Sequence, residues 1–180
     1  MDFAAIAAAG LNHVRLPIGY WAWDVSQGEC PSRSLLGDGV LTTTPTSGEP
    51  YIQGQLQYLD TAVGWAARYG LKVIVDLHGA PGSQNSFDNS GQRLNYPAWH
   101  TQTGAVARTN AIIKTLADKF AGNQWVVPII SPLNEPAGFY DEMMGTIKQY
   151  WYDSFGNIRF PYGSSKQVTL IGFGWINSGV

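Results

Sequence analysis

The sequence predicts an α/β fold in which strands alternate with helices. Two observations carry this prediction. Apolar residues recur at helical spacing in several segments, and the short strand-like segments between them are apolar throughout rather than alternately apolar and polar. Strands of that kind are typical of a parallel sheet covered on both faces or closed into a barrel. At 180 residues, 44% of them hydrophobic, the chain is long enough for the core of one domain.

The first half of the chain predicts two helices and two strands. Residues Asp2 to Ala9 are rich in alanine, which favours a helix, and the apolar stretch Leu11 to Ile18 predicts a strand. In Tyr51 to Tyr69 apolar residues fall three or four positions apart, as on one face of an amphipathic helix. The run Lys72 to Leu77 then predicts a buried strand.

The second half repeats this order. Apolar spacing predicts a helix over Val106 to Phe120 and another over Met143 to Phe155. Each is followed by a short apolar segment, Trp125 to Ser131 and Val168 to Ile171, which we predict to be strands. A strand, a helix and a next strand in this order form a parallel crossover unit.

Two long segments interrupt the pattern. Ser26 to Gly48 holds glycine, serine, threonine and proline with little periodicity, and we interpret it as an atypical insert. His78 to Trp99 follows a strand directly. Loops after the carboxyl ends of parallel strands carry the chemistry of α/β proteins, so the second segment is the candidate site.

Composition excludes several function classes. A formal net charge of −2 gives no general attraction to nucleic acid or to anionic lipid. The single cysteine, Cys30, offers no internal disulfide, and the three histidines show no zinc-ligand spacing with it. No apolar run reaches the roughly 18 residues of a membrane span. We expect no metal, no nucleic acid and no membrane partner.

Glu135 is the candidate general acid. It stands in the sequence Asn134-Glu135-Pro136, just after a predicted strand. A partly buried glutamate there can donate a proton to a leaving oxygen, while Asn134 can bind a substrate hydroxyl. The alternative is a glutamate that starts a helix, stabilised by the helix dipole, between two turn residues.

Arg15 and His78 are candidate substrate-binding residues on predicted strands. A cation in the middle of an apolar strand needs a carboxylate partner, which is either a catalytic carboxylate or one in a structural ion pair. His78 ends its strand and is either a donor to a substrate hydroxyl or a core histidine with satisfied hydrogen bonds.

The loop GAPGSQNSFDNSG mixes polar side chains with one aromatic ring, as a hydroxyl-rich ligand requires. It lacks the lysine of a phosphate-binding loop. Tyr20, Trp21 and Trp23 form an aromatic cluster, which we interpret mainly as packing, with one ring available to a sugar. The polar and aromatic candidates of the loop are Gln84, Asn85, Phe87, Asp88 and Asn89.

Four segments in order, GLNHVRLPIGYWAW, VIVDLHGAPGSQNSFDNSG, LNEP and VTLIGFGW, resemble the fungal exo-β-1,3-glucanases of glycoside hydrolase family 5. The resemblance implies a (β/α)₈ barrel of which this chain covers about strands two to five. It further implies a retaining mechanism that releases glucose from the non-reducing end of β-1,3-glucan without a cofactor. An extracellular or cell-wall location and a monomeric state are implied as well.

The resemblance also implies roles for individual residues. Glu135 matches the acid/base, Asn134 its neighbour at the substrate 2-hydroxyl, and Arg15 and His78 residues beside the cleaved bond. Phe87 matches an aromatic at the cleft entrance. Asp88 and Asn89 match the loop that recognises the terminal glucose.

The catalytic nucleophile of this family lies on strand seven, beyond the part of the barrel that the resemblance covers. A retaining glycosidase needs two carboxylates about 5 Å apart. We therefore expect residues 1–180 to be a fragment of a single catalytic domain, inactive alone. The alternatives are a non-catalytic glucan-binding protein that is complete at this length, and an endo-acting β-glucanase or cellulase of the same family.

Overall fold

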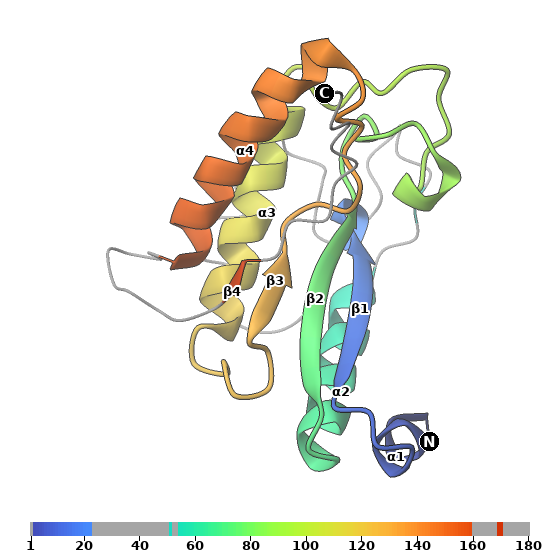
Figure 1. The fold of residues 1–180 in the computed structure, drawn as a ribbon, viewed down its shortest axis with the longest axis vertical. Coiled ribbons are helices and arrows are strands. Elements are labelled where there is room, and N and C mark those ends of the chain that lie inside the picture. Colours follow the sequence, from blue (N-terminus) through green and yellow to red (C-terminus); the bar gives the residue numbers. More distant parts are fainter. Residues whose placement is uncertain (1, 23–50, 52–53, 160–168, 171–180) are drawn as a thin grey trace, which may run out of the picture.

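The protein forms an open parallel sheet with helices packed against it (Figure 1). A computed structural model of the chain describes residues 2–22, 51, 54–159 and 169–170. The strand order in the sheet is the order in the chain, β1-β2-β3-β4, and every neighbouring pair is parallel. The strands are β1 (His13–Gly19), β2 (Lys72–Gly79), β3 (Ile129–Ser131) and β4 (Thr169–Leu170).

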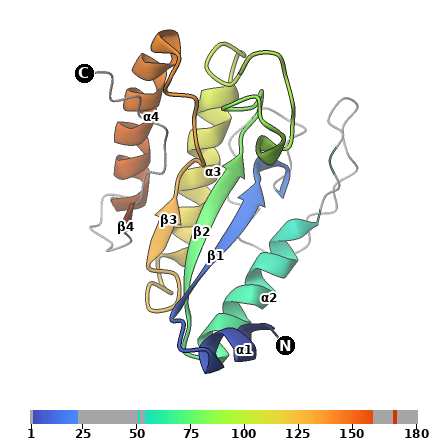
Figure 2. The same cartoon turned by 45° about the vertical axis from the view of Figure 1, so that its right-hand side comes forward.

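The register of the strands brings their carboxyl ends together. Val14 of β1 lies opposite Val73, and Ile18 opposite Leu77, while Asp76 lies opposite Ser131 of β3. The loops that follow these strands therefore leave from one edge of the sheet, as they do in parallel α/β folds. Figure 2 shows the three longer strands pointing the same way.

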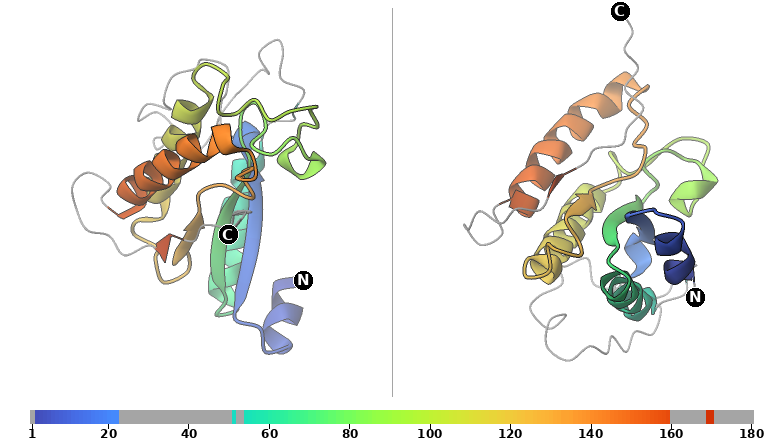
Figure 3. Two further views of the ribbon diagram at one scale, coloured as in Figure 1. Left: turned by 45° about the horizontal axis from the view of Figure 1, so that its top comes forward. Right: turned by 60° about the horizontal axis from the view of Figure 1, so that its bottom comes forward.

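Helices connect successive strands and cover the sheet. α2 packs against β1 and β2, and α3 lies beside α4 (Figures 2 and 3). α1 precedes β1 at the opposite end of the sheet from the carboxyl-end loops (Figure 1). In the described part of the chain the α-helices are α1 (Asp2–Ala8), α2 (Gln55–Arg68), α3 (Ala105–Phe120) and α4 (Asp141–Arg159).

The core lies between the helices and the sheet. Val73, Val75 and Leu77 of β2 have no exposed area, and because they stand two positions apart they lie on one face of the strand, which packs into the core. The apolar faces predicted from helical spacing are buried here too. They supply Leu59, Val63 and Ala66 from α2 and Ile112, Ile113, Leu116 and Phe120 from α3.

Two predicted elements begin well before the observed ones. α2 begins at Gln55 instead of Tyr51, since Gly54 has a φ of 102°, which is not helical. The strand predicted over Trp125 to Ser131 is only Ile129–Ser131, because its first part forms a turn that leaves Trp125 75% exposed. An apolar run does not reveal which of its members the sheet buries.

The other predicted helices and strands within the described residues are present with somewhat different bounds, such as Asp141–Arg159 for the helix predicted over Met143 to Phe155. β2 is two residues longer than predicted and includes His78 and Gly79. The insert Ser26 to Gly48, Cys30 and Trp23 lie outside the described residues. Within those residues, no helix is long and apolar enough to cross a membrane.

Candidate active site

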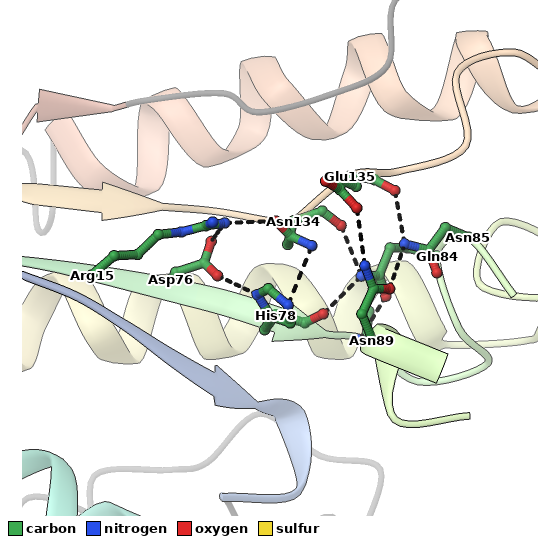
Figure 4. A network of polar contacts seen from close by, with 9 residues as sticks. Arg15, Asp76, His78, Gln84, Asn85, Asn89, Asn134 and Glu135 are labelled. Atoms are coloured by element: carbon green, nitrogen blue, oxygen red, sulfur yellow. Dashed lines mark hydrogen bonds and ion pairs between the residues drawn. The ribbon is translucent and has the colours of Figure 1, made fainter. Parts of the chain in front are cut away.

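A ring of four polar side chains joins β1, the carboxyl end of β2 and the segment that follows β3 (Figure 4). We call Arg15, Asp76, His78 and Asn134 the strand-end ring. Arg15 Nη2 lies 2.9 Å from Asp76 Oδ1 and donates to Asn134 Oδ1 at 2.6 Å. His78 Nδ1 lies 2.6 Å from Asp76 Oδ2, and its Nε2 lies 3.5 Å from Asn134 Nδ2. The contacts thus close into a circle.

The donors and acceptors in the strand-end ring are mutually consistent. Because Asn134 Oδ1 accepts from the guanidinium, the amide nitrogen of Asn134 must face His78 and donate to it. His78 Nε2 is then the acceptor, so the proton is on Nδ1, which donates to Asp76. The ring fixes both the tautomer of His78 and the orientation of the Asn134 amide.

Asp76 is the buried charge of the ring. Its side chain has no exposed area, whereas those of Arg15 and His78 are 37% and 28% exposed. A carboxylate this deep needs charged or hydrogen-bonding partners on both oxygens, and Arg15 and His78 supply them. The carboxylate that the sequence required near Arg15 is therefore Asp76. Arg15 also contacts Asn134, which ties this ion pair to the residue beside Glu135.

A second group of side chains surrounds Glu135. We call Gln84, Asn85 and Asn89, all from the loop after β2, the loop clamp. Gln84 Nε2 donates to the backbone carbonyl of Asn134 at 2.8 Å, and Asn85 Nδ2 donates to that of Glu135 at 3.1 Å. Asn89 Nδ2 donates to Glu135 Oε2 at 3.0 Å. Three neutral amides thus hold one glutamate by its backbone and its carboxyl (Figure 4).

Glu135 is not held as the first residue of a helix. It has a φ of 46°, a left-handed conformation that is uncommon for a residue with a side chain, and α4 begins only at Asp141. The interpretation as a helix-start glutamate is therefore wrong. The strained backbone aims the side chain toward Asn89 and the carboxyl-end loops (Figure 4).

Two further loop candidates lie near the clamp. Asp88 begins a short 3₁₀ turn, Asp88–Ser90, and is exposed. Phe87 is 43% exposed, and its ring stacks with Phe139 at a centroid distance of 6.4 Å. The loop is held internally by a hydroxyl contact of 2.6 Å between Ser83 and Ser90, both fully buried.

A hollow of about 540 Å³ borders the site on the side of β1 and α2. His78, Asp88 and Asn89 line its end at the carboxyl-end loops. Glu135 is not among its lining residues, so the hollow adjoins the candidate acid without enclosing it.

Tyr20 and Trp21, the two members of the aromatic cluster that the structure describes, serve packing. Tyr20 is 3% exposed, and Trp21 stacks on Tyr51 at a centroid distance of 4.2 Å. The Trp21 ring also lies over Gly19 and Gly91, where an added Cβ would come within 2.3 and 2.4 Å of it. Only glycine fits beneath this ring, which accounts for both residues.

Sequence reasoning missed the roles of Asp76 and Gln84. The spacing does hold a signal for Asp76, since Asp76 and His78 stand two positions apart on one strand and therefore on one face. Gln84 and Asn85 were expected to face a ligand, whereas both are buried and bind backbone. Among the described residues, no cluster of three or more histidine, cysteine or acidic side chains could hold a metal ion.

Comparison with known proteins identifies the family. The sequence model of the family Cellulase (glycosyl hydrolase family 5) matches residues 2–168. The chain belongs to glycosyl hydrolase family 5. It is 46% identical over 158 residues to a glucan 1,3-beta-glucosidase of Blumeria graminis, covering 88% of this chain and 32% of that protein. It is 42% identical over 170 residues to a probable glucan 1,3-beta-glucosidase A of Emericella nidulans, covering 94% and 36%.

Solved structures show the fold of this family member. The rutinosidase from Aspergillus niger matches with a TM-score of 0.69 at 16% identity, over 95% of this chain and 46% of that one. Cel5A of Thermotoga maritima, solved with cellobiose, matches with a TM-score of 0.59 at 18% identity, over 97% and 46%. The open sheet is thus part of a (β/α)₈ barrel, and the chain spans about a third of the curated relatives it matches.

Proposed function

We propose that the natural protein containing this chain hydrolyses β-1,3-glucan and releases glucose from the non-reducing end. The observation that carries the proposal is the placement of Glu135 at the carboxyl end of β3, where three amides of the loop clamp hold it. Two relatives that are at least 42% identical carry the name glucan 1,3-beta-glucosidase, one of them as a probable activity, and this supports the substrate and the bond cleaved.

In the proposed reaction Glu135 protonates the glycosidic oxygen and later activates water. Each step needs a carboxyl group and no cofactor. Asn134 binds the substrate 2-hydroxyl, and the strand-end ring fixes its amide for that contact. His78 and Arg15 shape the space beside the cleaved bond. Phe87, Asp88 and Asn89 contact the sugar from the loop.

The nucleophile of a double displacement is the second part of this proposal. Both oxygens of Asp76 face Arg15 and His78, so this carboxylate already serves the strand-end ring. We assign the nucleophile to a part of the natural protein outside these 180 residues. The chain is then a fragment, strands two to five, of one catalytic domain, with a glucan substrate, an extracellular or cell-wall location and a monomeric state.

The mass of the natural protein tests the fragment proposal. Intact-mass and peptide-mapping measurements on protein purified from its source should give a mass well above 19.6 kDa. We further propose that the atypical insert contains retained non-coding sequence, so we expect no peptides from inside Ser34 to Thr46. A mass that corresponds to 180 residues would contradict the proposal and favour a glucan-binding protein without catalysis.

Glu135→Gln tests the catalytic proposal. In the full-length natural protein this change should lower glucose release from laminarin by about 10² to 10⁴, because general acid–base catalysis contributes that much. Glu142→Gln, which changes another carboxylate at the start of α4, is the matched control and should keep its activity. Unchanged hydrolysis by Glu135→Gln would contradict the assignment.

An endo-acting glucanase is the second candidate, since the matching family model bears the description Cellulase. Product size separates the two. Exo action gives glucose as the first product from laminarin, whereas endo action gives a series of oligosaccharides.

A further inference from the structure

Glu135 has a backbone conformation that its surroundings must maintain. Its φ of 46° lies in the left-handed region, where a side chain crowds the backbone. Such conformations persist when neighbouring groups determine them, and they gather at functional sites. The groups that hold Glu135 in this conformation therefore also determine where its carboxyl group points.

The peptide groups on both sides of Glu135 are fixed by consecutive amides. Gln84 Nε2 donates to the Asn134 carbonyl at 2.8 Å, and Asn85 Nδ2 donates to the Glu135 carbonyl at 3.1 Å. The backbone N–H of Ala137 donates to the Gln84 carbonyl at 3.0 Å. With the planes before and after Glu135 both bound, its φ and ψ have little freedom.

Gln84 is suited to this role because every polar atom of its side chain is used. Its Oε1 accepts from the Ala80 N–H at 3.0 Å, and its Nε2 donates to the His78 carbonyl at 2.9 Å as well as to Asn134. The side chain has no exposed area. Gln84 thus joins the end of β2 to the segment after β3, and a glutamate of the same shape would lack both donors.

We propose that Gln84 and Asn85 are positioning residues that aim the Glu135 carboxyl group at the leaving oxygen of the substrate. The inference rests on the proposed function, in which Glu135 is the general acid. Neither residue touches substrate. They act through the backbone of Glu135, and Asn89 holds the carboxyl oxygen that completes the orientation.

The test compares two leaving groups, using the full-length natural protein with Gln84→Met. Met is of similar length and uncharged but donates no hydrogen bond. A sugar leaving group needs protonation, whereas 2,4-dinitrophenolate does not. Misplacing the acid by about 1 Å should lower kcat/KM on laminaribiose about 100-fold. On 2,4-dinitrophenyl β-glucoside we expect a loss of less than about threefold, because that step needs no acid.

Three variants frame this result. Gln84→Glu keeps the acceptor for Ala80 and the shape, and it should show the same dependence on leaving group. Glu135→Gln sets the full effect of losing the acid. Thr109→Val removes a buried hydroxyl that accepts a hydrogen bond from Trp99 Nε1 at 3.0 Å. Because neither residue belongs to the loop clamp, this variant should lower both kcat/KM values equally or not at all.

Each outcome decides a separate claim. If Glu135→Gln lacks the leaving-group dependence, the proposed function fails. If Glu135→Gln shows it but the folded Gln84 variants lose activity equally on both substrates, or keep it on both, the positioning role is overturned. Gln84 variants that do not fold would also overturn the positioning role, because the hydrogen bonds of Gln84 would then stabilise the fold instead of orienting the Glu135 carboxyl group.

Discussion

The strand-end ring and the loop clamp lie side by side but are built in opposite ways (Figure 4). The ring binds side chain to side chain, with a buried carboxylate at its centre and two partly exposed basic residues around it. The clamp uses neutral amides, and of its three hydrogen bonds to Asn134 and Glu135, two go to backbone carbonyls. Charged and hydrogen-bonded side chains hold the strand-end ring together, whereas the loop clamp binds mainly to the backbone around Glu135.

This difference separates two tasks. The strand-end ring presents Asn134 and His78 with defined donors and acceptors, which suits recognition of a hydroxyl. The loop clamp leaves the side chain of Glu135 free of any charged partner among the described contacts and sets its direction instead. For a general acid, the orientation of its carboxyl group toward the leaving oxygen matters more than a nearby charge of opposite sign.

Removal of Asp76 should give the largest loss of stability. Asp76→Leu leaves Arg15 and His78 without their buried partner, and we expect the free energy of unfolding to fall by about 2 to 4 kcal/mol. Asn85→Ala removes only neutral hydrogen bonds and should cost about 1 to 2 kcal/mol. Urea denaturation of both variants measures the comparison.

The matched control for that comparison is an exposed ion pair. Asp60 Oδ1 lies 2.8 Å from Lys119 Nζ, and its side chain is 53% exposed. Asp60→Leu should therefore change stability by less than about 1 kcal/mol. A loss from Asn85→Ala as large as that from Asp76→Leu would show that charge is not what distinguishes the strand-end ring.

Tyr150 should give a smaller effect that appears at high pH. Burial raises the pKa of Tyr150 above its ordinary value of 10. Its hydroxyl donates at 2.7 Å to the carbonyl of Pro132, which stands two residues before Asn134 in the chain. Above pH 10 the hydroxyl of Tyr150 therefore stays protonated in the folded state but ionises in the unfolded state. This contribution is complete below pH 10, and above it stability falls by about 1.4 kcal/mol per pH unit.

Two variants isolate that contribution. Tyr150→Phe should lose about 1 kcal/mol at pH 7 with the hydrogen bond and should show a shallower fall of stability above pH 10. Tyr152→Phe, which removes a hydroxyl from a residue that is 76% exposed, is the control. Equal slopes in the wild type and Tyr150→Phe, measured by urea denaturation across pH 8 to 11, would contradict the assignment.

The strands follow from the sequence because each is a short apolar run that alternates with segments of helical spacing. Because the predicted strands are parallel, the sequence also predicts that His78 and Glu135 lie at one edge, since His78 ends its predicted strand and Glu135 follows the next one, whereas Arg15 stands in the middle of its strand. What remains hidden is which carboxylate pairs with Arg15. That depends on the register between β1 and β2, which an apolar run does not encode.

The loop clamp could not be derived from the sequence. A run of polar residues after a strand suggests a ligand, and nothing local distinguishes an amide that faces solvent from one that binds a carbonyl across 50 residues. The left-handed conformation of Glu135 is equally hidden, because it arises from tertiary contacts rather than from the residue type.

The most direct test of the account is azide rescue of Glu135→Ala in the full-length natural protein. With 2,4-dinitrophenyl β-glucoside the first step needs no acid, and an anion such as azide needs no general base in the second. If Glu135 is the acid/base, azide should raise kcat at least about tenfold and yield β-glucosyl azide, with the configuration retained. No response to azide, or an α-glucosyl azide product, would contradict it.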